Sequence, residues 1–232
     1  MKAIAIIPAR GGSKRLPRKN LRPLCGVPLV AWSIRAARDA KLVSDVYVST
    51  DDLEIAMEAE RYGAEVVMRP PEISGDDARI EAALRHVLRS LPELPEVVVT
   101  LQPTSPFRAA GLIDRCIIAL RDSPSLNSTF TVRPAGVTWW QEYLESGRER
   151  YRWTNQFRAT QIPQSQAWNI VQERFSEDGS VFACRTECVT VGSDRRAVPV
   201  LPIVNEWSPD IDTAEDWKLA EAFLRAREEV PA

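Results

Sequence analysis

Short apolar runs alternate with amphipathic segments through the first half of this 232-residue chain. Four runs rich in Ile and Val are expected to form strands buried on both faces: residues 3–8, 45–50, 64–69 and 96–103. The segments that follow them have helical periodicity: residues 28–40, 51–63, 77–91 and 111–122. This alternation predicts an α/β fold with a doubly wound, mainly parallel sheet covered by helices on both faces.

The alternation of predicted strands and helices stops between about Pro134 and Glu173, where the sequence is polar and aromatic and has no clear periodicity. This stretch holds Trp139, Trp140, Trp153 and Trp168 out of seven tryptophans in the chain. Such aromatic surface is typical of an interface with a second subunit, although an irregular lobe packed on its own domain would also bury it. We expect one domain over residues 1–232, with a small lobe inserted at about 134–175.

Two later segments complete the predicted domain. Residues 179–187 read as a further strand, and residues 212–229 as an amphipathic helix that turns Trp217, Ala220 and Leu224 inward. Thr213 and Asp216 have the spacing of a capping box at the start of this helix.

Composition argues against several kinds of partner. A net charge of −2 is not that of a general nucleic-acid coat, so we expect no nucleic-acid partner. The apolar run at the start is far too short for a signal peptide or a membrane span, and no later stretch reaches membrane length. We therefore expect a cytoplasmic protein without a membrane partner.

Histidine and cysteine content narrows the possible chemistry. His86 is the only histidine, and it sits in a helical pattern as a surface or boundary residue, so catalysis by a histidine base is not expected. The four cysteines are scattered apart from one C-x3-C pair, which does not suggest a zinc site.

A basic loop, "IPARGGSKRLPRKN" (7–20), follows the first predicted strand. It contains no acidic residue and five cations: Arg10, Lys14, Arg15, Arg18 and Lys19. Ligands of α/β folds bind at the carboxyl ends of the strands, and glycines let backbone N–H groups close on oxyanions. The loop has neither the Walker nor the G-x-G-x-x-G pattern. It predicts an anion site, and the alternative is a solvated basic loop.

Three further predicted strand ends have unusual sequences: "STDD" (49–52), "LQPTSP" (101–106) and "SPDIDTAED" (208–216). The basic loop and the first two of these are expected to face one crevice. Asp210 and Asp212 fall on the same side of an extended segment, an arrangement that suits Mg²⁺. An isolated D-x-D can equally be a solvated turn or a helix cap. Cations for phosphate together with carboxylates for metal favour a nucleotide site.

Five motifs in this order resemble one family: "IAIIPARGGSKRLPRKN", "STDD", "VVMRPPEI", "LQPTSPFR" and "DIDTAEDW". The chain resembles the acylneuraminate cytidylyltransferases, the CMP–sialic acid synthetases and their relatives, over most of its length, more weakly between about 134 and 180. The resemblance implies a Rossmann-like nucleotidyltransferase domain with a smaller dimerisation lobe, acting as a homodimer. It also implies transfer of CMP from CTP to the anomeric hydroxyl of a 2-keto sugar acid, with release of pyrophosphate and Mg²⁺ as cofactor.

The resemblance also implies roles for individual residues. Arg10, Lys19 and Asp210 would be catalytic, Gln102 and Arg158 would bind the sugar, and Asp210 and Asp212 would hold the metal. The nucleotide would be bound by Pro8, Ala9, Arg10, Gly11, Gly12, Ser13, Lys14, Lys19, Asn20, Arg69, Ala78, Pro103, Thr104 and Ser105. The alternative roles are purely structural: a salt bridge for Arg69 and a loop cap for Gln102. The proton of the attacking hydroxyl is expected to leave through Asp210 or a metal-bound water.

The sequence departs from the family at the acceptor side. Where an arginine is expected upstream of "EDGSVF" the chain has Trp168, and Arg158 could be the same element displaced. The base-side helix also departs, with Arg79 and Ile80 where small hydroxyl residues are common in the family. A modified or different acid is therefore expected to be preferred over N-acetylneuraminate, unless the weakly matching lobe is misaligned. The alternative function is a related transferase acting on an eight-carbon keto acid, a legionaminic-type sugar or a phosphonate, or using GTP. A non-catalytic nucleotide-binding module should have lost the metal carboxylates.

Overall fold

A computed structural model describes residues 1–134, 140–144, 151–155, 175–192, 194–205 and 210–228. The chain divides into two compact units. The first consists of Met1–Arg133 with Glu177–Ala232, and the second of Pro134–Ser176. The described residues contain no helix that is long and apolar enough to cross a bilayer.

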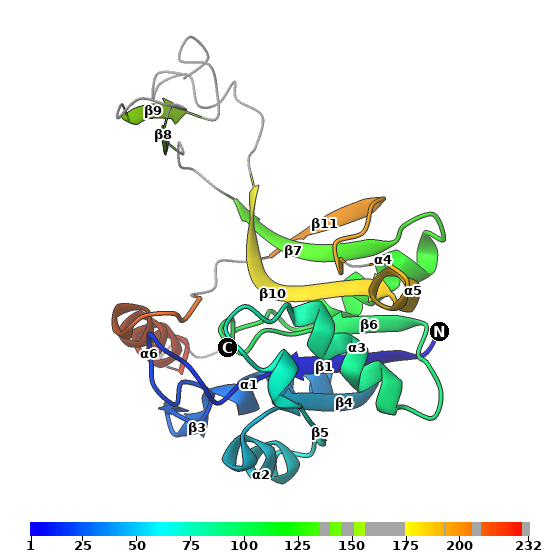
Figure 1. Cartoon of the computed structure of the whole chain (residues 1–232), viewed down its shortest axis with the longest axis horizontal. Helices are drawn as coiled ribbons and strands as arrows, with labels where there is room; N and C mark the ends of the chain where they lie inside the picture. Colours follow the sequence, from blue (N-terminus) through cyan, green and yellow to red (C-terminus); the bar gives the residue numbers. More distant parts are fainter. Residues whose placement is uncertain (135–139, 145–150, 156–174, 193, 206–209, 229–232) are drawn as a thin grey trace. The chain divides into compact units, whose positions relative to one another are not determined.

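A seven-stranded sheet in the order β11-β7-β10-β6-β1-β4-β5 forms the centre of the first unit (Figure 1). Its strands are β1 (Ala3–Pro8), β4 (Val43–Thr50), β5 (Glu65–Met68), β6 (Val97–Thr100), β7 (Ser128–Pro134), β10 (Phe175–Arg185) and β11 (Val200–Val204). Strand β1 pairs in parallel with β4 and β6, and β4 pairs in parallel with β5. Because β10 runs antiparallel to β6, the sheet is mixed but mainly parallel, as predicted.

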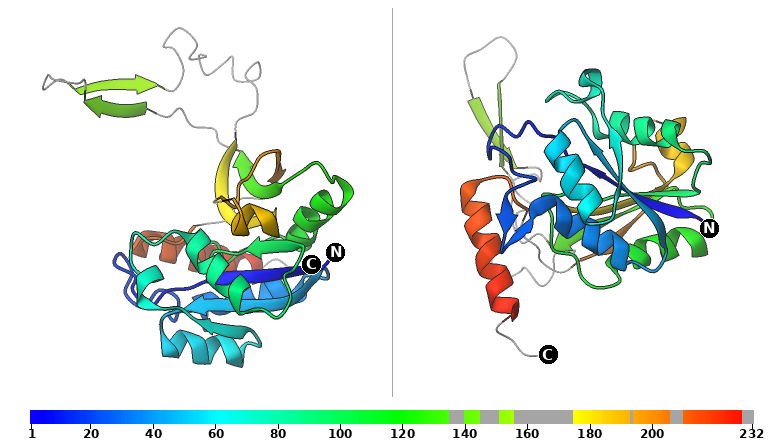
Figure 2. Two further views of the ribbon diagram at one scale, coloured as in Figure 1. Left: turned by 45° about the vertical axis from the view of Figure 1, so that its right-hand side comes forward. Right: turned by 90° about the horizontal axis from the view of Figure 1, so that it is seen from below.

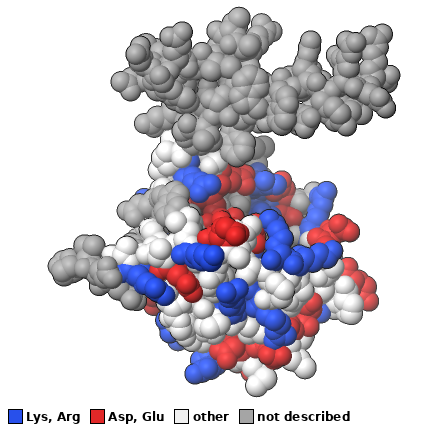
Figure 3. All heavy atoms as spheres, turned by 90° about the vertical axis from the view of Figure 1, so that its left-hand side faces the viewer, with Lys and Arg blue, Asp and Glu red and all other residues white. Residues whose placement is uncertain are grey.

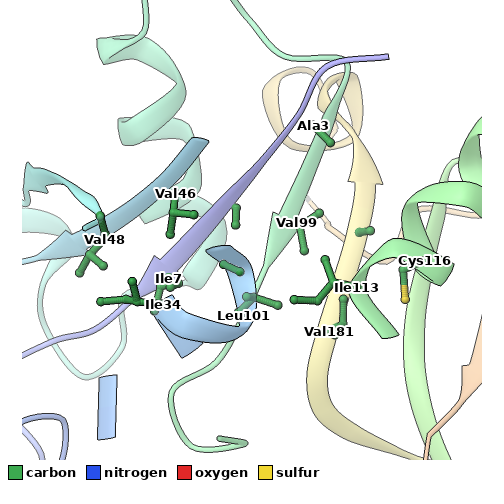
Figure 4. Packing of buried hydrophobic residues seen from close by; sticks show 14 of the residues in the cluster. Ala3, Ile7, Ile34, Val46, Val48, Val99, Leu101, Ile113, Cys116 and Val181 are labelled. Atoms are coloured by element: carbon green, nitrogen blue, oxygen red, sulfur yellow. The ribbon is translucent and has the colours of Figure 1, made fainter. Parts of the chain in front are cut away.

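Helices cover both faces of this sheet (Figure 2). They are α1 (Leu29–Asp39), α2 (Leu53–Arg61), α3 (Ile80–Ser90), α4 (Leu112–Asp122), α5 (Thr186–Thr190) and α6 (Ala214–Glu228), with a 3₁₀ turn, η1 (Pro71–Ile73). Strand β1 shows how both faces are buried, because its side chains point alternately to one face of the sheet and to the other. Ala3, Ala5 and Ile7 pack with α1, α2 and α4, and Figure 4 shows Ala3 and Ile7 in this cluster. Ile4 and Ile6 pack on the other face with α3 and α5. The predicted doubly wound arrangement is confirmed.

Helix α6 packs apart from these layers, in a third cluster of buried side chains that includes Leu16, Leu29 and Ile211. Trp217, Ala220 and Leu224 of α6 are buried there, as the sequence predicts. The predicted capping box is also present: Oδ2 of Asp216 accepts from the Thr213 N–H at 2.8 Å, and the Asp216 N–H donates to Thr213 Oγ1 at 3.2 Å. The basic loop and the segment before α6 are thus tied together by one small core.

Some local features differ from the sequence pattern. Three residues that the periodicity of α1 places on one face, Leu29, Trp32 and Ala36, do not form its main buried face. The residues buried against the sheet are Val30, Ile34 and Ala37, while Leu29 and Trp32 pack in the α6 cluster. Because α1 contacts both the sheet and that cluster, two of its faces are apolar. Strands β7 and β11 were not predicted, and three of the four buried residues of β7 are hydroxyl residues, Ser128, Thr129 and Thr131, with Val132 as the fourth.

Short hairpins occur in each unit. In the first, β2 (Pro23–Leu24) pairs with β3 (Val27–Pro28) across Cys25 and Gly26, which adopt φ of 47° and 81°. In the second, β8 (Trp140–Leu144) pairs with β9 (Tyr151–Asn155) in antiparallel fashion. Trp139, Trp168 and the proposed sugar ligand Arg158 lie outside the described residues, so their predicted roles stay predictions.

Candidate active site

A pocket of about 580 Å³ lies where β1 and β6 end. Its walls are formed by the basic loop, by Arg69 directly after β5 in the chain, by residues 75–80, by the loop after β6 and by Asp212. The lining residues are Pro8, Arg10, Ser13, Lys14, Arg15, Lys19, Asn20, Arg69, Gly75, Asp76, Ala78, Ile80, Gln102, Pro103, Thr104 and Asp212. Segments up to two hundred positions apart in sequence therefore meet at one edge of the sheet.

Most residues expected to bind nucleotide, sugar or metal line this pocket. Ala9 and Ser105 do not, because both are buried behind it, and neither do Gly11, Gly12 and Asp210. Four lining residues were not among the predicted nucleotide, sugar or metal ligands: Arg15, which belongs to the basic loop, Gly75, Asp76 and Ile80. The signal that could have identified Asp76 is its place in a loop that follows a parallel strand, at the same edge as the other motifs.

The "STDD" motif does not line the pocket; it supports the basic loop from behind. The Gly11 N–H donates to Asp51 Oδ1 at 2.9 Å. Asp52 Oδ1 caps α2 by accepting from the N–H groups of Glu54 and Ile55. A Cβ atom on Gly11 would lie only 2.6 Å from Asp52 Oδ2, so a side chain at this position would displace the loop.

Every cation of the basic loop is paired with a carboxylate. Arg10 and Lys14 both contact Asp76, Arg15 and Lys19 both contact Asp212, and Arg18 contacts Asp52 and Glu54. Basic and acidic side chains accordingly alternate on the face toward which β1 runs, as Figure 3 shows for the described residues. The loop is positively charged in sequence but locally neutralised in the ligand-free protein.

Lys19 is the most buried of these cations, with 9% of its surface exposed. Its Nζ donates to the backbone oxygen of Ile211 at 2.8 Å and to Asp212 Oδ1 at 3.0 Å. Asn20 beside it donates from Nδ2 to the backbone oxygen of Arg10 at 2.8 Å. These contacts fix both ends of the loop and orient its cations toward the pocket.

The segment Asp210–Asp212 has the alternation predicted for it. Ile211 is fully buried, whereas the two aspartates flanking it are not. The helix-cap alternative does not apply to either aspartate, since the capping carboxylate belongs to Asp216, whose Oδ2 also accepts from the Asp212 N–H at 3.0 Å. No cluster of three or more metal-ligating side chains occurs in the described part of the chain. Two carboxylates still fit Mg²⁺, which completes its shell with water and phosphate oxygens.

The Asp210 carboxyl lies beside Thr104 and Ser105, with Ser105 Oγ 3.3 Å from Oδ1. Loss of hydration at this position raises the pKa of Asp210, and the nearby Asp212 charge raises it further. The Thr104 hydroxyl bond lowers the same pKa, although the net direction is upward. A carboxyl with a raised pKa is suited to exchanging a proton.

Arg69 reaches the pocket from the end of β5. Its Nη2 donates to the backbone oxygen of Ser49 at 3.0 Å. Burial lowers the pKa of Arg69, Asp51 partly offsets this, and Arg10 lowers it again. The alternative of a simple salt bridge finds no support, because no carboxylate lies within ion-pair distance of Arg69 among the described residues.

Gln102 lines the pocket from a loop that Arg108 holds in place. The Arg108 guanidinium donates to the backbone oxygens of Gln102 and Ser180, at 2.9 and 2.8 Å, and to Ser33 Oγ at 3.0 Å. Burial lowers the pKa of Arg108 to about 9, which leaves it charged at neutral pH. Gly179 (φ 72°) allows β10 to approach, since a Cβ there would lie 3.0 Å from Ser105 Oγ.

Comparison with known proteins places this chain among cytidylyltransferases. A cytidylyltransferase family model matches residues 4–143. An N-acylneuraminate cytidylyltransferase A from Danio rerio is 33% identical over 94% of the chain, which spans about half (49%) of that relative's length. A CMP-N,N'-diacetyllegionaminic acid synthase from Legionella pneumophila is 28% identical, over 99% of both chains.

Solved structures support the fold. A CMP:2-keto-3-deoxy-manno-octonic acid synthetase complexed with CTP superposes with a TM-score of 0.72, covering 98% of this chain and 100% of the other, at 18% identity. A doubly wound α/β fold binds its ligand at the carboxyl edge of the sheet, and together with the family match this pocket defines the chain as a nucleotidyltransferase by class. This chain belongs to the cytidylyltransferase family.

Proposed function

We propose that this protein transfers CMP from CTP to the anomeric hydroxyl of a sialic-acid-like 2-keto sugar acid and releases pyrophosphate. The observation that carries the proposal is the meeting of Arg10, Lys14 and Lys19 with Gln102 and Thr104 in one pocket. Relatives named for CMP-activated sialic and legionaminic acids support this substrate class.

The charges of the site fit the reaction. CTP carries about four negative charges and the acceptor a carboxylate, so the two reactants repel each other unless cations intervene. Arg10, Lys14 and Lys19 would hold the triphosphate, with Asn20 and Thr104 toward the ribose and triphosphate. Arg69 would contact the base and Gln102 the acceptor sugar. Positioning and electrostatic stabilisation supply most of the catalysis in phosphoryl transfer.

Asp210 and Asp212 would hold Mg²⁺, which when bound offsets the charge that develops on the leaving pyrophosphate. For this the Asp212 carboxylate must exchange at least part of its contact with Lys19 and Arg15. The raised pKa of Asp210 makes its carboxylate the group in this site best suited to take the proton of the attacking hydroxyl. Once it is deprotonated, the anomeric oxygen forms a bond to the α-phosphorus as the bond to pyrophosphate breaks.

The acceptor is the least constrained part of the proposal. In sequence, Trp168 stands about where the family would have a carboxylate-binding arginine, unless Arg158 is the same element displaced or the lobe is misaligned, and tryptophan cannot replace a bidentate contact of this kind. We expect a modified sialic acid, such as a legionaminic-type sugar, to be used better than N-acetylneuraminate. A 3-deoxy-octulosonate acceptor is the second candidate, because a 3-deoxy-manno-octulosonate cytidylyltransferase from Bdellovibrio bacteriovorus is 37% identical over 134 residues.

The tryptophan-containing lobe at 134–175 is proposed to form a homodimer, because aromatic clusters of this size are typical of interfaces. Light scattering at micromolar concentration tests it, and a monomer would contradict it. A cytoplasmic location belongs to the same proposal, since CTP is supplied there.

The proposed function is tested by a pyrophosphate-release assay with Mg²⁺, in which each of the four nucleoside triphosphates is paired with each of several sugar acids. We expect release with CTP and a 2-keto sugar acid, and none when either is omitted. Pyrophosphate release with GTP but not with CTP would contradict the proposal. So would release in the absence of a sugar acid.

A further inference from the structure

The Asp76 carboxylate bridges two cations of the pocket. Its Oδ1 lies 2.7 Å from Arg10 Nη1, and its Oδ2 contacts Lys14 Nζ. Each oxygen therefore serves one cation, as two oxygens of a phosphate chain could. All three side chains face solvent in part, with 36% of Arg10, 41% of Asp76 and 80% of Lys14 exposed.

Asp76 differs from the other carboxylates around the basic loop because it has no second structural role in the described part of the chain. Asp52 contacts Arg18 but also caps α2. Asp212 contacts Lys19 within a segment that the Asp216 capping box holds. Among the described residues, Asp76 caps no helix and accepts side-chain hydrogen bonds only from Lys14 and Arg10, and these bonds, led by that of Lys14, lower its pKa.

We propose that Asp76 is a displaceable counter-ion, whose carboxylate oxygens hold the position that the terminal phosphate oxygens of a polyphosphate ligand would take between Arg10 and Lys14. Two cations in one pocket repel each other, and the carboxylate keeps them together until the ligand arrives. A triphosphate or pyrophosphate brings several negative charges against the single charge of Asp76, so it displaces the carboxylate. When pyrophosphate is to leave, the carboxylate competes for the same cations and favours its release.

Displacement of the Asp76 carboxylate by phosphate is expected to change binding only modestly. Ion pairs between partly exposed side chains contribute little to stability, and breaking the two pairs of Asp76 would weaken polyphosphate binding by roughly three- to tenfold. Because exposed charges are screened by salt, the effect should shrink as ionic strength rises. The identity of the polyphosphate as CTP rests on the proposed function, whereas the competition between carboxylate and phosphate does not.

The test is calorimetric titration of inorganic pyrophosphate into the full chain without added metal. Asp76→Asn keeps the shape of the side chain and removes its charge. Asp77→Asn is the matched control, since Asp77 is exposed, lies one position along, and has no ion pair within the described residues. We expect Asp76→Asn to tighten pyrophosphate binding by about three- to tenfold, and more at low salt, with little change in Asp77→Asn.

Four results would overturn the inference, and the first three are equal dissociation constants for wild type and Asp76→Asn, an equal gain in Asp77→Asn, and no binding to any of the three proteins at millimolar pyrophosphate. Weaker binding in Asp76→Asn would also overturn it, because it would make Asp76 part of the ligand site. This titration involves neither CTP nor a sugar. Tighter binding without turnover would therefore refute only the proposed function, and turnover with unchanged binding would refute only the role of Asp76.

Discussion

Lys19 Nζ lies 3.0 Å from Asp212 Oδ1, although the two residues are 193 positions apart in the chain. The contact joins the loop after the first strand to the segment before the last helix. It places a cation suited to phosphate beside a carboxylate suited to metal, so the two halves of the proposed site are built as one unit. The same contact means that Asp212 is engaged before any ligand arrives.

Asp210→Asn and Asp212→Asn should each raise the Mg²⁺ concentration needed for half-maximal turnover. An amide oxygen is a poorer ligand for a hard dication than a carboxylate. The measurement is a Mg²⁺ titration of pyrophosphate release, accompanied by thermal unfolding of the same samples. An unchanged titration with a lower melting temperature would show that the two aspartates serve the fold and not the metal.

Arg10→Ala should lower kcat/KM by roughly a hundred- to a thousandfold while the fold remains intact. Loss of one charge-assisted contact to a transition state typically costs about 3 to 4 kcal/mol. Arg89→Ala is the control, because Arg89 is an exposed cation in the last turn of α3, away from the pocket. Turnover within a few-fold of wild type would end the assignment of Arg10 as catalytic.

Much of the sheet could be predicted because β1, β4, β5 and β6 are short, aliphatic and separated by periodic helices. Strands β7 and β11 could not, since β7 satisfies buried threonines through tertiary hydrogen bonds that no local pattern reveals. Thr131 illustrates this: its hydroxyl bonds to Asp178, and it accepts from the Val181 N–H at 3.0 Å. Edge and antiparallel strands of this kind are specified by their neighbours.

The candidate site was predictable to a similar extent. Residue types and strand ends were enough to bring Arg10, Lys19, Gln102 and Asp212 to one place. Ion pairing was not predictable, because Asp76 lies in a loop whose path depends on η1 and on the packing of α3. The supporting role of Asp52 was hidden for the same reason: it requires the close approach of Gly11.

Asp216→Ala should lower the free energy of unfolding by about 1 kcal/mol at pH 7, the usual effect of losing a helix cap. Burial alone would raise the pKa of Asp216, but its hydrogen bonds with Thr213 and the Asp212 N–H lower it overall from 3.8. Its stabilisation is therefore present above pH 3.8 and is lost as pH falls further. Denaturant unfolding at pH 7 and below pH 3.8 measures this.

Glu215→Ala is the matched control for this substitution, since Glu215 is an exposed carboxylate in the same helical turn. A loss of stability at pH 7 as large as that of Asp216→Ala would contradict the capping role. So would a difference between wild type and Asp216→Ala that does not shrink in acid.

Thr104→Val should move the acid limb of the pH profile of kcat/KM to higher pH. Loss of hydration around the carboxyl raises the pKa of Asp210, and the Thr104 hydroxyl partly offsets this by stabilising the ionised carboxylate. Removing the hydroxyl leaves the loss of hydration unopposed by that bond, so the carboxylate protonates at a higher pH and activity is lost sooner on acidification. If the acid limb of Thr104→Val stays at the wild-type pH, the ionisation that limits kcat/KM is not that of Asp210.

The central claim is that a sugar acid displaces pyrophosphate from CTP at the α-phosphorus. It is tested most directly by following the reaction with ³¹P nuclear magnetic resonance, with CTP, Mg²⁺ and a legionaminic-type or sialic acid. The account predicts that the three CTP resonances give way to one phosphodiester resonance and one pyrophosphate resonance in equal molar amounts. Formation of CMP or CDP with orthophosphate, or persistence of CTP with every 2-keto sugar acid, would contradict it.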